Sequence, residues 1–100
     1  MKGKKYKMKS KMWVYPGMAG WRFMYIGKRE SAEIRKSREG KKRRGWGSVR
    51  VRATIGKTSW DTSIFPDKDG PYLLPIKLAV RKAEGIMDDD IVTLSITLRE

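Results

Sequence analysis

The sequence of 100 residues contains no cysteine and no histidine. Without cysteine the chain can form no disulfide and no thiolate metal site, and the absence is typical of proteins from a reducing compartment. Without histidine it lacks the commonest general base, the commonest metal ligand and every Ser-His or Cys-His nucleophile. We therefore expect a non-enzymatic protein without a cofactor or a metal site.

Long apolar runs are also missing. The opening MKGKKYKMKSKMWV carries charges but no continuous apolar stretch, so it does not predict a signal peptide. No run approaches the roughly 20 apolar residues that a membrane-spanning helix needs. The sequence thus predicts one domain, located in the cytoplasm, with no membrane partner.

Acidic residues are scarce, and mainly in the first half of the chain. The protein has 24 Lys+Arg against 11 Asp+Glu, a net charge of +13. Residues 1–50 hold 17 basic and 3 acidic residues, whereas residues 51–100 hold 7 and 8. A surface charged only for solubility would be more even, so the first half predicts a positive surface.

Residues 5–14 alternate almost strictly, which predicts a strand with one wet face. One face holds Tyr6, Met8, Ser10, Met12 and Val14, and the other holds Lys5, Lys7, Lys9, Lys11 and Trp13. Alternate strand residues lie about 6.6 Å apart, so the lysine row would track a phosphate backbone. The same lysines would also protect an edge strand against aggregation, and both interpretations are open.

A β-hairpin is the clearest structural prediction. Residues 49–55 and 58–65 are separated by Gly56-Lys57, and glycine first in a two-residue loop favours a type II′ turn. Counting back from the turn pairs Ala53 with Trp60, Val51 with Thr62 and Val49 with Ile64 on an apolar side. Thr54 with Ser59, Arg52 with Asp61 and Arg50 with Ser63 then form a polar side.

The remaining elements follow from shorter patterns. We predict a strand over residues 21–26, a helix over 31–36 and a final strand over 91–98. A second helix is predicted to begin at Pro75 and to end before Gly85, with Ile76, Ala79, Val80 and Ala83 as its buried stripe. The order β-β-α-β-β-α-β predicts a mainly β (α+β) barrel rather than a parallel sheet.

Several segments resemble one known family. Trp60-Asp61-Thr62-Ser63-Ile64-Phe65-Pro66-Asp67, Tyr72–Lys77 and Ala79–Ile86 are similar to DUF1905, a prokaryotic family named as a domain of unknown function. Gly20–Phe23, Ser31–Arg35 and Arg44–Ser48 fit one branch of it. The resemblance runs from Met12 to Leu98, which gives a single domain over 12–98 after a Lys-rich extension or first strand at 1–11.

The resemblance implies a small, partly open β-barrel, similar to the double-split barrels of bacterial transition-state regulators and antitoxins. By that analogy the chain would form a homodimer. The sequence departs from the pattern at Asp89, where both groups usually have glycine, and at Gly27, where the family usually has proline. The family has no established activity, so the resemblance implies a fold and no function.

A basic loop is the second candidate site. Its residues are Lys41, Lys42, Arg43, Arg44 and Trp46, followed on the next strand by Arg50. Arginine offers bidentate contacts to phosphate or guanine, and a tryptophan can stack on an unpaired base. The alternative is a solvated loop whose tryptophan packs on the barrel.

The other candidates favour structural roles. Of the tryptophans, Trp21 and Trp60 are predicted to lie in the core, and Trp13 to be the most exposed because it shares the face of the lysines. Residues 67–70 are predicted to be a turn rather than a cation site, since the remaining ligands of a calcium loop are absent. Residues 88–90 are also predicted to be a turn, since three adjacent turn residues point in different directions.

Three functions fit these patterns. The first is a non-enzymatic domain that binds DNA or RNA through its basic surface. The second is a barrel that binds a small ligand or peptide in an aromatic-lined pocket of at least a few hundred Å³. The third is an interaction module for acidic proteins.

Overall fold

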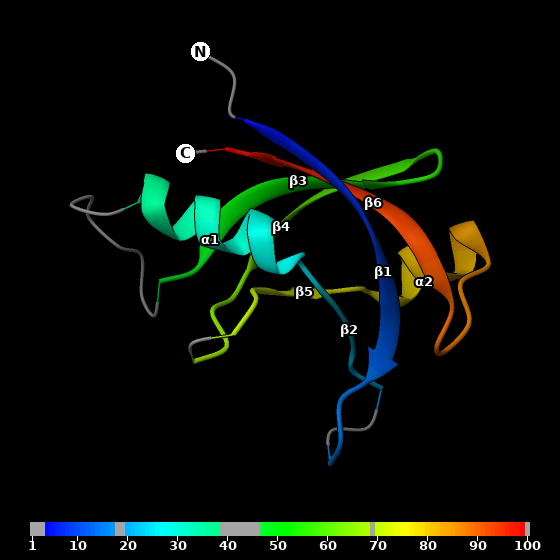
Figure 1. Ribbon diagram of the computed structural model, residues 1–100. Coiled ribbons are helices and arrows are strands. Elements are labelled where there is room, and N and C mark those ends of the chain that lie inside the picture. Colours follow the sequence, from blue (N-terminus) through cyan, green and yellow to red (C-terminus); the bar gives the residue numbers. More distant parts are fainter. Residues whose placement is uncertain (1–3, 18–19, 39–46, 69, 100) are drawn as a thin grey trace.

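The computed structural model describes residues 4–17, 20–38, 47–68 and 70–99 (Figure 1). Its strands form one six-stranded sheet in the order β4-β3-β6-β1-β2-β5. The elements along the chain are β1 (Lys5–Val14), β2 (Arg22–Tyr25), α1 (Lys28–Ser37), β3 (Val49–Ile55), β4 (Thr58–Ile64), β5 (Leu73–Pro75), α2 (Leu78–Glu84) and β6 (Ile91–Leu98).

The two outermost strands of this order meet and nearly close the sheet. Phe65, just after β4, pairs with Leu73 of β5 through two backbone hydrogen bonds of 2.9 and 2.8 Å. Every ladder between the strands is antiparallel. The predicted mainly β, partly open barrel and its order are confirmed, and β5 is an additional short strand.

Strand β1 belongs to both halves of the barrel. Residues Lys5–Lys11 pair with β6, the last strand, and the two run side by side in Figure 1. From Met12 to Val14 the strand pairs with β2 instead. The sheet therefore splits where β1 changes partner, and no break in the strand marks that point.

The hairpin of β3 and β4 has the predicted register. Val49 faces Ile64, Arg52 faces Asp61 and Ala53 faces Trp60. Gly56 has φ 58°, whereas Lys57 is not in the positive φ region, as a type II′ turn requires. Turn chemistry and two-residue alternation agree here, which explains why the register could be counted from the sequence.

The predicted second helix is wrong in part. Pro75 closes β5, and α2 begins only at Leu78. Val80 is buried on α2 and Ile76 is buried just before it, but Ala79 and Ala83 are exposed. The helix is only seven residues long, and Val80 is its one buried residue. The other predicted stripe positions on the helix therefore face solvent.

The end of α2 agrees with the sequence. Gly85 adopts the left-handed conformation with φ 63°. The N–H of Ile86 donates to the carbonyl of Arg81 at 2.9 Å, the bond of a Schellman cap, and Ile86 is buried. Helix α1 is longer than predicted, and it covers the core with Ser31 and Ile34.

Inward-facing side chains fill the barrel. Fully buried members come from strands of both halves and from α1: Met12, Met24, Ile26, Ile34, Val51, Ile64, Leu74, Leu94 and Ile96. Trp60 is buried as predicted, but the prediction for Trp21 is wrong, because its side chain is 48% exposed. Trp21 precedes β2 on the outward phase of that strand. Within the described part of the chain, no helix has the length and apolar character needed to cross a membrane.

Candidate functional site

The predicted lysine row lies on the outer face of β1. Lys5, Lys7, Lys9 and Lys11 are all exposed. In the described part of the chain none of these ammonium groups has a carboxylate within ion-pair distance. The row is therefore a line of cations held at fixed spacing by the strand, with its charge left for solvent or a ligand.

A row of hydroxyls runs beside the lysines. Thr97, Ser95 and Thr93 of β6 lie opposite Lys5, Lys7 and Lys9. The polar side of the hairpin continues this surface across β3 and β4, where Thr54 Oγ1 and Ser59 Oγ are 2.8 Å apart. We call this outer surface of β1, β6, β3 and β4 the lysine face. Lysines and hydroxyls are the donors that proteins use on phosphate oxygens.

The lysine face also holds arginines and one carboxylate that forms ion pairs with two of them. Asp61 Oδ1 accepts from Arg52 at 2.8 Å and is 2.7 Å from a guanidinium nitrogen of Arg99. Hydrogen bonds from Arg52 and then Arg99 hold the pKa of Asp61 below its ordinary value. Arg50 is exposed on the same side of β3, opposite Ser63. The carboxylate therefore stays ionised but is matched by two cations.

An aromatic cluster continues the line of lysines. Past Lys11 the outward positions of β1 and its end are Trp13 and Tyr15, and the facing side of β2 and its start carries Trp21, Phe23 and Tyr25. The ring of Trp13 stacks on that of Tyr25 at 5.3 Å between centroids, and Trp21 stacks on Phe23 at 5.8 Å. We call these five residues the aromatic cluster. Such cross-strand ring pairs stabilise a sheet.

The rim of the aromatic cluster is open to solvent. Tyr15, Trp21 and Tyr25 are each more than a third exposed, whereas Trp13 is only half-buried between them. Trp13 Nε1 is buried without a hydrogen-bond partner in the described structure. The prediction that Trp13 is the most exposed tryptophan is wrong, because the neighbouring rings cover it. Sequence alternation could place these rings on one face, but only the register of β1 and β2 brings them together.

The phenol of Tyr25 has a perturbed titration. Burial raises its pKa first, and the nearby carboxylate of Asp67 raises it further. The hydroxyl therefore stays protonated well above neutral pH, and the ring presents a neutral face beside the lysines.

The predicted basic loop lies outside the described residues. This applies to Lys41, Lys42, Arg43, Arg44 and Trp46, which fall between the end of α1 and the start of β3. The prediction of nucleic-acid contact by this loop therefore remains a prediction.

The edge-strand interpretation of the lysine row also stays open. Over Lys5–Lys11, β1 pairs with β6 on one side, and no described strand pairs with the other side. Two polar contacts lie there: Ser10 Oγ donates to the carbonyl of Tyr25 at 2.8 Å, and the N–H of Gly27 lies 3.2 Å from Met8 Sδ.

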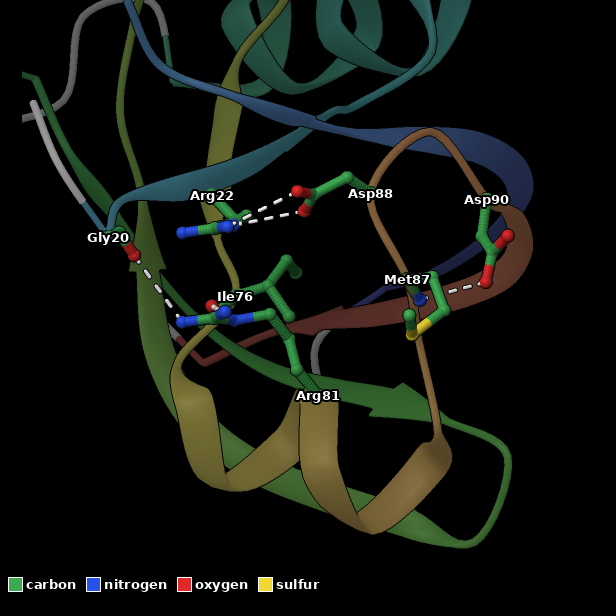
Figure 2. A network of polar contacts seen from close by, with 7 residues as sticks. All are labelled: Gly20, Arg22, Ile76, Arg81, Met87, Asp88 and Asp90. Atoms are coloured by element: carbon green, nitrogen blue, oxygen red, sulfur yellow. Dashed lines mark hydrogen bonds and ion pairs between the residues drawn. The ribbon is translucent and has the colours of Figure 1, made fainter. Parts of the chain in front are cut away.

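In the acidic turn at residues 88–90, the carboxylates of Asp88 and Asp90 point apart (Figure 2). Asp88 binds Arg22, and Asp90 Oδ2 accepts from the N–H of Met87 at 2.8 Å. Asp89 has φ 72°, in the left-handed region that favours glycine. These contacts are those of a turn.

Comparison with known proteins identifies the family. No curated protein matches the chain. A family model does match, over residues 9–96, and its description is a domain of unknown function. The match begins before Met12, so Lys9 and Lys11 lie inside it. Since the match covers most of the chain, the protein belongs to the DUF1905 family.

Proposed function

We propose that this domain binds single-stranded nucleic acid without acting on it chemically. The lysine face takes the phosphates, and the aromatic cluster takes the bases. One observation carries the proposal: a single strand, β1, holds Lys5, Lys7, Lys9 and Lys11 and then Trp13 in one unbroken outward alternation.

The two parts supply different kinds of affinity. Lysines that neutralise phosphates release counterions, which gives binding that weakens steeply with salt and carries little sequence preference. Aromatic rings that stack on unpaired bases add about 1–3 kcal/mol per base. Bases in a duplex are stacked on one another and do not reach an exposed ring, so the aromatic cluster favours a single strand.

The extent of the surface suits a short strand. Residues 5–15 span about 33 Å at the rise of an extended strand. Small β-barrels that bind single strands occupy about 4–16 nucleotides. An oligonucleotide of about 16 nucleotides therefore covers the lysine row and reaches the aromatic cluster.

The test is fluorescence anisotropy with oligo(dT), oligo(U) and a duplex of equal length at low salt. We expect both single strands to bind more tightly than the duplex. The double variant Lys7→Gln/Lys9→Gln should reduce the slope of log K against log salt by about 1.4, since each phosphate contact on a single strand contributes about 0.7. The matched control is Lys36→Gln/Lys82→Gln, which removes two exposed lysines from α1 and α2.

A second variant examines the rings. Tyr15→Ala removes an exposed ring at the end of the row, and we expect single-strand affinity to fall about 5-fold or more while duplex affinity is unchanged. Polyglutamate serves as an anion without bases. Undetectable binding of oligo(dT), preference for the duplex, or equal binding of polyglutamate would each contradict the proposal.

A further inference from the structure

A groove opens on the barrel where β4 separates from β5. In the described structure, backbone pairing joins this side of the barrel only through Phe65, just after β4, and Leu73 of β5, and beyond this pair lies a cavity of about 670 Å³. Residues from the start of β2, from β4 and from the segment running from β5 into α2 line it, among them Trp21, Phe65 and Leu78. This volume lies within the range of about 300–1,000 Å³ that is common for small-molecule sites.

Large apolar side chains are exposed on the walls of the groove. The side chains of Leu78, Trp21 and Phe65 are 52%, 48% and 39% exposed, and all three line the cavity. Pro75 and Ile76 form part of the same lining. Large apolar side chains gathered in one concave place mark a binding site more often than scattered ones do.

A guanidinium is fixed in this groove by carbonyls. Arg81 Nε donates to the carbonyl of Ile76 at 3.2 Å, and Nη2 donates to the carbonyl of Gly20 at 3.4 Å (Figure 2). Within the described residues, Arg81 has no carboxylate at ion-pair distance. Its charge is therefore positioned but not neutralised by a partner of its own.

The other charges of the lining leave the groove positive. Lys77 is exposed and has no carboxylate partner in the described part of the chain. Arg22 is bound by Asp88, and the lining carboxylate of Asp61 is bound by two arginines. Arg81 and Lys77 are thus the cations that an anionic ligand would meet.

We propose that the groove binds a small molecule with a planar apolar ring system and one anionic group, a carboxylate or a phosphate. The rings lie against Trp21, Leu78 and Phe65, and the anionic group bonds to Arg81 and Lys77. This site shares β4 with the lysine face, where Asp61 lines the groove, but none of its lining residues comes from β1, β6 or β3, so the lysine row itself lies outside the groove. Trp21 alone belongs to both the groove and the aromatic cluster.

The test is a titration of isotope-labelled protein followed by amide and indole NMR shifts. The probes are 2-naphthoate, 1-naphthyl phosphate and neutral 2-naphthamide. We expect both anions to shift signals of the groove lining and to bind about tenfold or more tightly than the amide, since a charge-assisted hydrogen bond distinguishes them. The anion that binds more tightly shows whether the site prefers a carboxylate or a phosphate.

Two variants separate charge from apolar contact. Lys77→Gln should weaken 2-naphthoate about tenfold, whereas Lys82→Gln, on the helix that follows Lys77, should leave it unchanged. Leu78→Ser should weaken all three probes. Equal affinity for 2-naphthoate and 2-naphthamide, or shifts confined to β1 and β6, would overturn the proposal.

The outcome is independent of nucleic-acid binding. Lys77→Gln should leave the affinity for oligo(dT) unchanged, and Lys7→Gln/Lys9→Gln should leave the affinity for 2-naphthoate unchanged. Loss of both ligands in both variants would show one shared anion surface and would also contradict a separate groove site.

Discussion

Arg22 and Asp88, 66 residues apart in the chain, form a two-point ion pair. Arg22 Nε donates to Asp88 Oδ1 at 3.0 Å and Nη2 donates to Oδ2 at 3.2 Å (Figure 2). The pair joins β2 to the turn that leads into β6. Because both bonds are made, the plane of the guanidinium is fixed, and with it one wall of the groove.

The first prediction concerns pH. The hydrogen bonds from Arg22 hold the pKa of Asp88 below its ordinary value of 3.8. A carboxyl with a lowered folded-state pKa stabilises the protein above its unfolded pKa, and the contribution is lost as pH falls through the folded pKa. Asp88→Asn should therefore be less stable than the wild type at neutral pH and equally stable at about pH 2.

Urea denaturation at both pH values measures this difference. Asp89→Asn is the control, because Asp89 has no ion pair within the described residues. An unchanged gap between Asp88→Asn and wild type at the lower pH would contradict a role for the ionised carboxylate.

The second prediction concerns the hairpin turn. Glu84 Oε2 accepts from Thr58 Oγ1 and from the N–H of Lys57, which ties the turn to α2. A Cβ on Gly56 would clash with Glu84 Oε1, whereas a Cβ on Gly85 would meet nothing within 4 Å. Both glycines have positive φ, so Gly85→Ala carries only the backbone cost of about 1 kcal/mol.

Gly56→Ala should be more destabilising than Gly85→Ala, because it also displaces Glu84. The double variant Gly56→Ala/Glu84→Ala should show less than the sum of its single effects, since the clash is already gone. Free energies of unfolding from urea titration provide the comparison, and strict additivity would argue against contact between the two positions.

The third prediction concerns the buried hydroxyl of Ser31. Its Oγ accepts from the N–H of Tyr72 at 3.0 Å and donates to the carbonyl of Ile26 at 3.3 Å. Ser31→Ala leaves that N–H buried and unpaired, which should reduce the free energy of unfolding by about 1–3 kcal/mol. Ser37→Ala, at the end of the same helix, is the control and should cost less, because its hydroxyl is partly exposed. Equal costs would remove the special role of Ser31.

The fourth prediction concerns Asp89, a residue with a Cβ whose backbone lies in the left-handed region. Its φ of 72° is unfavourable for a residue with a Cβ. Asp89→Gly should raise the free energy of unfolding by about 0.5–1 kcal/mol, after the greater flexibility of glycine in the unfolded chain is subtracted. Asp89→Asn removes the charge but keeps the side chain, so a gain shared by both variants would point to charge instead of backbone conformation.

Local patterns predicted much of the fold. The hairpin register followed from Gly56 and two-residue alternation, and the lysine side of β1 followed from alternation alone. Pro75 was misplaced because a proline at an edge strand and a proline at a helix start look alike in sequence. Trp21 was misplaced because its large apolar side chain suggested the core, whereas its phase on β2 places it outside.

The candidate sites depend on contacts that no local pattern contains. The aromatic cluster requires the register in which Trp13 faces Phe23. The groove requires the separation of β4 from β5 and the reach of Arg81 to Gly20, 61 residues earlier. Both are consequences of how the barrel closes, which depends on pairings between strands far apart in the chain.

The pairing of β1 with β6 also determines when β1 can be completed. Lys5 pairs with Thr97, so the ladder between β1 and β6 cannot form until both ends of the chain have come together. Contacts of such long range slow folding toward milliseconds or seconds. During that interval an apolar-faced strand is exposed to other chains, and its four lysines repel them. We therefore expect Lys7→Gln/Lys9→Gln to aggregate more than Lys36→Gln/Lys82→Gln during refolding, even where the native stabilities are equal.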